Sequence, residues 1–367
     1  MPAYIGVDLH HDQLTFHKIL KDSQGKITHE NGVVLTSKIG EKFIPLLDKN
    51  SHVCVEASSC TYTFIKNLNE FKPLVHVVNP QSFKELYCSG KKTDKIDAKK
   101  LSNRLKTHIE DNDPEDGFPE VYIPDNESQQ LRYLFSTDKF ISKNIVSLKN
   151  RIKGFFRSRF IVIKSSQLLK DLTVLFDVVA ATRTERMQIM LLCDELKLLE
   201  AHKKEIRREI IDLGNSRFPS EIRILTSIQG IGEFTACALM SDIVDIRRFK
   251  NQKKLVSYLR SAPRVDSSGS VTKVGMINKR GRKTSFNNLL QGISYFRRTN
   301  PILGDFYDKK CNGKSKGKVR AAVVRKVIVT IYFMLKNEEL YKFCDNELHL
   351  RKMKKNSQKN KKSQVAA

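Results

Sequence analysis

The chain has 367 residues, and its 66 lysines and arginines outnumber its 40 aspartates and glutamates, which gives a formal net charge of +26. A positive excess of this size favours binding to polyanions such as nucleic acids. No apolar run approaches the roughly 20 residues of a membrane-spanning helix, and the N-terminus lacks the pattern of a secretory signal. The sequence therefore excludes an integral membrane protein and predicts a soluble, intracellular one, long enough for two or three domains.

Seven cysteines are scattered along the chain, and none belongs to a Cys-x-x-Cys pair. They are Cys54, Cys60, Cys88, Cys193, Cys237, Cys311 and Cys344. An odd, scattered set within apolar segments predicts reduced thiols in the core and argues against a zinc site.

Short runs of β-forming residues alternate with turns near the N-terminus. Runs rich in Val, Ile and Phe predict strands at residues 3–7, 14–20, 27–35, 52–56 and 74–78. A helix is predicted between the last two strands, at about residues 61–71. This order, in which three successive strands are followed by a strand, a helix and another strand, is that of an RNase H-like mixed sheet. Its active site lies where neighbouring strand ends meet.

Four carboxylates stand where such a fold would gather them. Asp8 and Glu56 close two of the apolar runs, and Asp94 and Asp97 are three residues apart, a spacing that shares one helix face. Carboxylate oxygens suit Mg²⁺, which can neutralise a phosphodiester and orient the attacking oxygen. The set predicts the metal site of a DNA- or RNA-processing enzyme. Taken singly, each acid is equally an ordinary turn residue, and Asp94 a helix N-cap.

The middle of the chain has a helical pattern. Apolar residues recur at three- and four-residue steps from Leu131 to Phe155 and again from Leu191 to Leu213, which predicts two long helices that pack on one another or on another protomer. The stretch between them extends the first helix or turns it back. Basic residues on the first helix fit either a solvated face or a nucleic-acid contact; they are Lys149, Arg151, Lys153, Arg157 and Arg159.

A Gly-x-Gly turn, Gly230-Ile231-Gly232, stands between an apolar segment and the start of a helix. This pattern is typical of a helix-hairpin-helix, in which backbone N–H groups face a DNA phosphate. The alternative is an αα-turn in which glycine serves only the backbone conformation.

Further on, Ser268-Gly269 lies in a segment that leads into the basic run 278–283. A serine in a cationic loop can attack phosphorus if its proton is removed and the phosphate charge is offset. A flexible surface linker explains the same residues, and Ser267 is an adjacent candidate.

Taken in order, these motifs resemble the DEDD transposases, insertion-sequence recombinases related to the Piv DNA invertases. The matching elements are Gly6-Val7-Asp8, Val55-Glu56, the Lys-Thr-Asp-x-x-Asp-Ala motif at 92–98, residues 228–232, Pro263, Ser268-Gly269, Asn300-Pro301, Phe306-Tyr307 and the helix 319–335. The resemblance runs to about Tyr341. One departure follows Gly281, where the family has Asn and then Leu-Arg and this chain has Arg282-Lys283.

The resemblance implies a domain order. Residues 1–125 would form a RuvC-like domain whose Asp8, Glu56, Asp94 and Asp97 bind Mg²⁺. Residues 126–215 would form a coiled-coil region, and 216–345 a mainly α transposase domain with a helix-hairpin-helix. Residues 346–367 would be a basic disordered tail.

The resemblance also implies a reaction and partners. Ser268 would form a covalent phosphoserine link to cleaved donor or target DNA, in a site assembled from two protomers of a dimer or tetramer. A non-coding bridge RNA would guide the enzyme, which would act in the prokaryotic cytoplasm at the nucleoid. Candidate nucleic-acid contacts are Gly230, Gly232, Arg264, Lys273, Lys279 and Arg280.

Three alternatives fit the same residues. The first is a site-specific DNA invertase of the same family. The second is a metal-dependent RuvC-like nuclease that hydrolyses DNA without a covalent intermediate. The third is a nucleic-acid-binding protein without catalytic activity.

Overall fold

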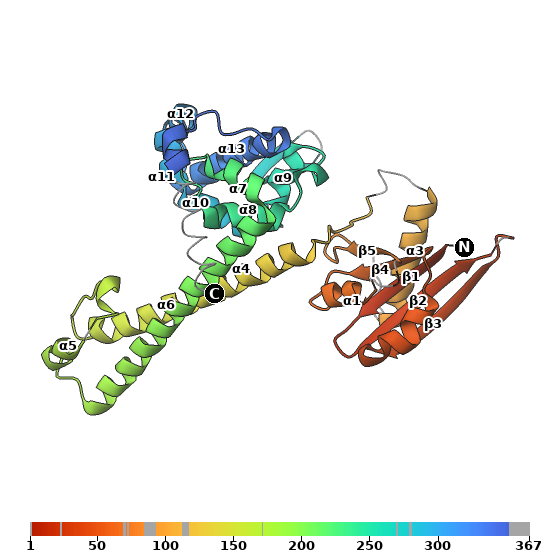
Figure 1. The fold of residues 1–367 in the computed structure, drawn as a ribbon, viewed down its shortest axis with the longest axis horizontal. Helices are drawn as coiled ribbons and strands as arrows, with labels where there is room; N and C mark the ends of the chain where they lie inside the picture. Colours follow the sequence, from red (N-terminus) through yellow and green to blue (C-terminus); the bar gives the residue numbers. More distant parts are fainter. Residues whose placement is uncertain are drawn as a thin grey trace. The chain divides into compact units, whose positions relative to one another are not determined.

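The computed structural model describes residues 2–22, 24–68, 71, 73–83, 93–111, 117–170, 172–268, 271–278 and 281–351, with the backbone alone at 265–268, 271–274 and 276. The chain divides into two compact units, Met1–Ile123 and Pro124–Ala367 (Figure 1). The first holds a mixed α/β sheet and the second is mainly helical, as the sequence predicts. None of the helices in the described part of the chain combines the length and apolarity needed to cross a membrane.

The first unit is built on a five-stranded mixed sheet in the order β3-β2-β1-β4-β5 (Figure 1). The strands are β1 (Ala3–Leu9), β2 (Gln13–Lys21), β3 (Ile27–Leu35), β4 (Ser51–Glu56) and β5 (Leu74–Val78). The first three form an antiparallel meander, and β4 and β5 continue the sheet in parallel with β1. Short helical turns at 36–46 and helix α1 (Thr61–Leu68) make the connections.

Both faces of the central strands are covered, which explains their continuous apolar sequences. On one face, Ile5 packs in a cluster with Phe43 and Phe64. On the other face, the next residue back, Tyr4, packs in a cluster with Leu101 of helix α3 (Asp94–Asp111). Alternation along the strand therefore gives each layer its own core.

Helix α3 approaches strand β1 at a residue without a side chain. A Cβ placed on Gly6 would lie 2.1 Å from the carbonyl oxygen of Ala98 and 2.5 Å from the amide nitrogen of Ser102. Ser102 also contacts the buried Nδ1 of His17 on β2, and burial lowers the pKa of that imidazole. The helix is thus fixed directly against the backbone of the sheet.

The second unit begins with two long helices. Helix α4 (Asn126–Arg157) and helix α6 (Arg183–Arg217) pack along one another, and α5 (Thr173–Val178) lies in the segment that turns the chain back (Figure 1). Asp125 caps α4 by accepting a hydrogen bond of 2.9 Å from the amide of Ser128. The predicted pair of long helices is confirmed, and the stretch between them reverses direction.

The remaining elements surround a buried helix, α8 (Glu233–Ile243), whose residues 236–243 are all buried. They are α7 (Pro219–Thr226), α9 (Gln252–Tyr258), the strands β6 (Pro263–Ser268) and β7 (Val271–Ile277), α10 (Thr284–Gln291), α11 (Ile293–Thr299), α12 (Pro301–Cys311) and α13 (Lys316–Asn337). The start of the predicted disordered tail, 346–351, is helical, because Asp345 accepts a hydrogen bond of 3.0 Å from the Leu348 amide and His349 is buried. Residues 352–367 lie outside the described chain.

A buried carboxylate in α8 holds the segment that follows β7. Asp242 is fully buried and accepts hydrogen bonds from Arg282 Nε at 2.8 Å and from the hydroxyl of Ser285 at 2.7 Å. The Ser285 amide donates a third bond of 3.2 Å to the same carboxylate. Arg282, the residue at which the sequence departs from the DEDD transposase pattern that it resembles, therefore has a structural partner.

We expect Gly6→Ala to lower the stability of the first unit by about 3 kcal/mol, because the new methyl group would overlap the backbone of α3. Hydrogen exchange of the α3 amides measures the effect. Gly40→Ala is the matched control, since no atom lies within 4 Å of a Cβ built there. Equal protection of α3 in both variants would contradict this account of the helix contact.

We expect Asp242→Asn to destabilise the second unit by about 3 kcal/mol, because Arg282 would lose its buried counter-charge. Urea unfolding measures the loss. Asp245→Asn removes a carboxylate from a surface pair with Arg247, whose side chain is 86% exposed, and should cost less than about 1 kcal/mol. Similar losses of unfolding free energy in the two variants would show that burial of Asp242 does not determine how much its pair with Arg282 contributes to stability.

Candidate active site

The ends of two parallel strands bring two of the predicted acids to one edge of the sheet. Val7 of β1 pairs with Val55 of β4, so that Asp8 and Glu56 are the next residues on neighbouring strands. The Asp8 side chain is 21% exposed. The hydroxyl of Thr61 donates a hydrogen bond of 2.7 Å to the main-chain oxygen of Glu56, which fixes the end of β4 against the start of α1.

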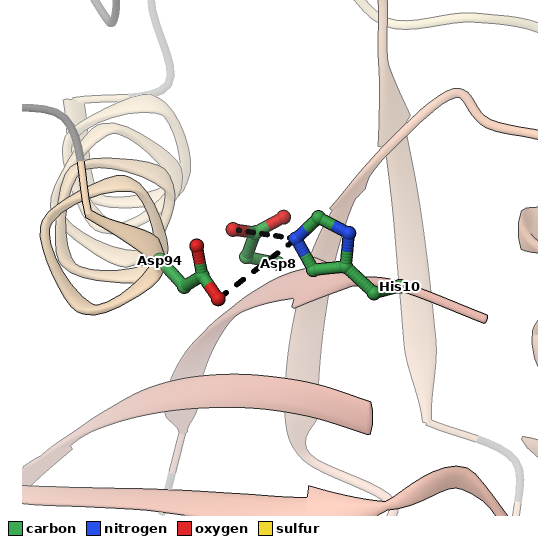
Figure 2. Close-up of side chains that lie close together, drawn as sticks. All are labelled: Asp8, His10 and Asp94. Atoms are coloured by element: carbon green, nitrogen blue, oxygen red, sulfur yellow. Dashed lines mark ion pairs between the residues drawn. The ribbon is translucent and has the colours of Figure 1, made fainter. Parts of the chain in front are cut away.

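The third acid, Asp94, is the first residue of α3. Thr93 precedes the helix, and its main-chain oxygen accepts bonds from the amides of Ile96 at 2.9 Å and Asp97 at 3.0 Å. Its hydroxyl lies 3.4 Å from the Ile96 amide, in the position of an N-cap. Thr93 rather than Asp94 therefore precedes the first turn as the cap, and Asp94 directs its carboxylate toward Asp8 (Figure 2).

A histidine completes this group. His10 Nε2 lies 3.6 Å from Oδ2 of Asp8 and 3.9 Å from Oδ2 of Asp94 (Figure 2). One ligand atom from each of the three residues lies within 4.8 Å of the others. His10 was not among the site residues predicted from the sequence, and the Asp-x-His spacing at the end of the first strand is the signal that could have found it.

The fourth acid, Asp97, lies on α3 and is 8% exposed. Its Oδ1 is buried and has no hydrogen-bond partner among the described residues. Neither Asp97 nor Glu56 belongs to the group of three. The structure brings Asp8 and Asp94 together with His10, and it places Asp97 on the same helix as Asp94 and Glu56 on the neighbouring strand β4.

These residues fit a divalent cation. Two carboxylates at this distance repel one another unless a positive charge lies between them. A buried carboxylate oxygen without a partner is costly, and a cation or its ordered water satisfies such an atom. Oxygen donors from Asp8 and Asp94 are those that Mg²⁺ and Mn²⁺ accept.

Ser268 belongs to the second unit. It ends β6 and pairs with Val271 of β7, so it is the last strand residue before the turn of the hairpin. The side chains of Ser267, Ser268 and Lys273 lie outside the described part of the structure, as do all atoms of Lys279 and Arg280. The choice of Ser268 over Ser267 stays a prediction.

A cleft lies beside the base of this hairpin, and its lining combines cations with apolar side chains such as Val256 and Val329. It has a volume of about 260 Å³, and its lining includes Pro263 at the start of β6 and three cations, Lys253, Arg325 and Lys326. Arg264, predicted from the sequence, is exposed on β6. The three lining cations were not predicted from the sequence, because they come from α9 and α13 and the sequence does not show that these helices lie beside the hairpin.

The Gly-x-Gly turn lies between α7 and α8. Gly230 has a φ of +102°, and a Cβ there would lie 2.8 Å from Cβ of Tyr295. Gly232 is the residue before α8. Backbone conformation and packing therefore explain Gly230 without a ligand, and the predicted DNA contact of the two glycines stays a prediction.

Comparison with known proteins adds independent information. Residues 222–308 match the model of a family described as "Transposase IS116/IS110/IS902 family", and this segment contains the hairpin with Ser268. A protein of Pseudomonas aeruginosa described as "Probable family 20 transposase" is 25% identical over 238 residues, which cover 62% of this chain and 66% of that relative, just under two thirds of its length. Both matches support an IS110-type transposase.

Proposed function

We propose that this protein is a DNA transposase that cleaves and rejoins DNA strands with two sets of residues, one in each unit. The observation that carries the proposal is the meeting of Asp8 and Asp94 with His10 at the edge of the sheet, within a chain of transposase family. The strand order β3-β2-β1-β4-β5 supports an RNase H-like, RuvC-like fold for the first unit.

Asp8, Glu56, Asp94 and Asp97 would hold Mg²⁺ in this proposal. When bound, the ion would neutralise charge on the scissile phosphate and favour the ionised form of the attacking hydroxyl. Asp8 lies in β1 and Asp94 begins α3, so the positions of these two carboxylates do not depend on reordering a loop.

Ser268 is the proposed nucleophile. Its Oγ would lose a proton and form a bond to phosphorus, while the sugar oxygen of one DNA strand leaves and takes up a proton. Attack by the hydroxyl of another strand would reverse this step, release the serine and join the strands without ATP. Three cations in the lining of the cleft, Lys253, Arg325 and Lys326, support a position for the DNA backbone beside the hairpin.

The proposal extends to the partners. The net charge of +26 supports binding of donor and target DNA together with a guide RNA. Because Ser268 and the acids belong to different compact units, a site composed from two protomers of a homo-oligomer is consistent with the chain. A DNA invertase of the same family would use the same residues on inverted sites.

The covalent step predicts that labelled DNA carrying the element's ends becomes attached to the wild-type protein and resists denaturing electrophoresis. Ser268→Ala should abolish this adduct, and Ser267→Ala, one residue away, should keep it. If Ser268→Ala still joins strands, the serine is not the nucleophile. Cleavage without any adduct in the wild type would instead identify a hydrolytic nuclease.

The acids predict a different pattern. Asp8→Asn and Asp94→Asn should each reduce strand cleavage by at least about 100-fold, because charge stabilisation at the phosphate is lost. DNA binding, measured by fluorescence anisotropy, should be largely kept. Asp12→Asn is the matched control, since Asp12 lies in the same turn with its side chain 63% exposed. Full strand cleavage by both acid variants would refute a catalytic role for Asp8 and Asp94.

A further inference from the structure

We propose that the imidazole of His10 is a direct ligand of the divalent cation, and that this nitrogen donor raises the affinity of the site for Mn²⁺ relative to Mg²⁺. The inference rests on the proposed metal-dependent function and adds a ligand of a different chemical type to the four acids. It concerns the first unit alone.

The distances suit a shared ion better than direct contacts. His10 Nε2 lies 3.6 Å from Asp8 Oδ2 and 3.9 Å from Asp94 Oδ2. Both distances exceed the roughly 2.7–3.2 Å of a nitrogen–oxygen hydrogen bond. Two ligands on one ion with bonds of about 2.1 Å lie about 3.0 Å apart when adjacent and about 4.2 Å apart when opposite. The observed spacing falls within that range.

The backbone of His10 is fixed where the ligand is needed. Its amide donates a hydrogen bond of 2.9 Å to the main-chain oxygen of Gln13, which closes the turn between β1 and β2. Hydrogen bonds also attach this turn to the end of β3. The Thr36 amide donates to the main-chain oxygen of Asp12 at 2.9 Å, and the Thr36 hydroxyl donates to that of His11 at 3.0 Å. A ligand on so constrained a turn loses little freedom when it binds.

The neighbouring histidine shows that this arrangement is specific to one side chain. His11 is 88% exposed, and its Nδ1 lies 3.6 Å from Oδ1 of Asp12. His10 is 51% exposed and faces the two site carboxylates. The two residues are adjacent and chemically identical, yet only His10 joins the metal-binding group.

The chemical type of the donor decides the preference among ions. Mg²⁺ takes oxygen ligands almost exclusively, whereas imidazole suits transition metals, and Mn²⁺ accepts both kinds of donor. A mixed set of carboxylates and one imidazole therefore favours Mn²⁺ more than carboxylates alone would. Removal of the imidazole should reduce this preference.

The test uses the full chain, freed of metal with a chelator and titrated with Mn²⁺. Pulsed electron paramagnetic resonance should show coupling of the bound Mn²⁺ to one nitrogen in the wild type. His10→Ala should abolish the coupling and weaken Mn²⁺ binding by about tenfold or more, with a smaller loss for Mg²⁺. His11→Ala should change none of these quantities, and circular dichroism should show that both variants are folded.

The outcomes separate this inference from the proposed function. Binding of Mn²⁺ that Asp8→Ala abolishes, but that shows no nitrogen coupling and is unchanged in His10→Ala, would overturn the role of His10 and keep the acids as metal ligands. Nitrogen coupling that survives His10→Ala would also overturn it. Failure of Mn²⁺ to bind in any Asp8-dependent way would overturn both the inference and the metal site.

Discussion

The contact between two backbones, that of α3 and that of β1, is the constraint on which the candidate site depends. Residue 6 has no side chain, so the carbonyl of Ala98 comes directly against the strand. Asp94 lies one helical turn before Ala98, and Asp8 lies two residues beyond Gly6. The two carboxylates lie close together because the helix packs against the strand. The contact between α3 and β1 therefore limits how far the two side chains can move apart.

The second unit fixes the segment that follows its β-hairpin in a comparable way. Helix α8 is buried, and its Asp242 binds both Arg282 and Ser285 on the chain that leaves the hairpin. A polar residue in the core thus positions a basic segment at the surface. In the first unit the proposed acids Asp8 and Asp94 therefore lie on elements that cannot shift without breaking a core contact.

Much of this arrangement could be predicted from the sequence, because it follows from local periodicity. Apolar runs ending in Asp8 and Glu56 predict strands whose ends adjoin, and the structure pairs those strands as expected. The Asp-x-His spacing marks His10 only as a candidate, because its approach to the acids depends on hydrogen bonds within the turn and from Thr36, just beyond the end of β3. The role of Arg282 was equally inaccessible, since its partner Asp242 is 40 residues away in the chain.

The pairing of Val7 with Val55 limits how this protein can change in length. Side chains alternate along a strand, so one residue inserted into β1 or β4 would turn Asp8 or Glu56 to the opposite face of the sheet. Insertions between the strands carry no such penalty, because a connecting segment can absorb them at the surface. New sequence can therefore be accommodated in the connection between β3 and β4, while β1 and β4, which carry Asp8 and Glu56, must keep their residue count.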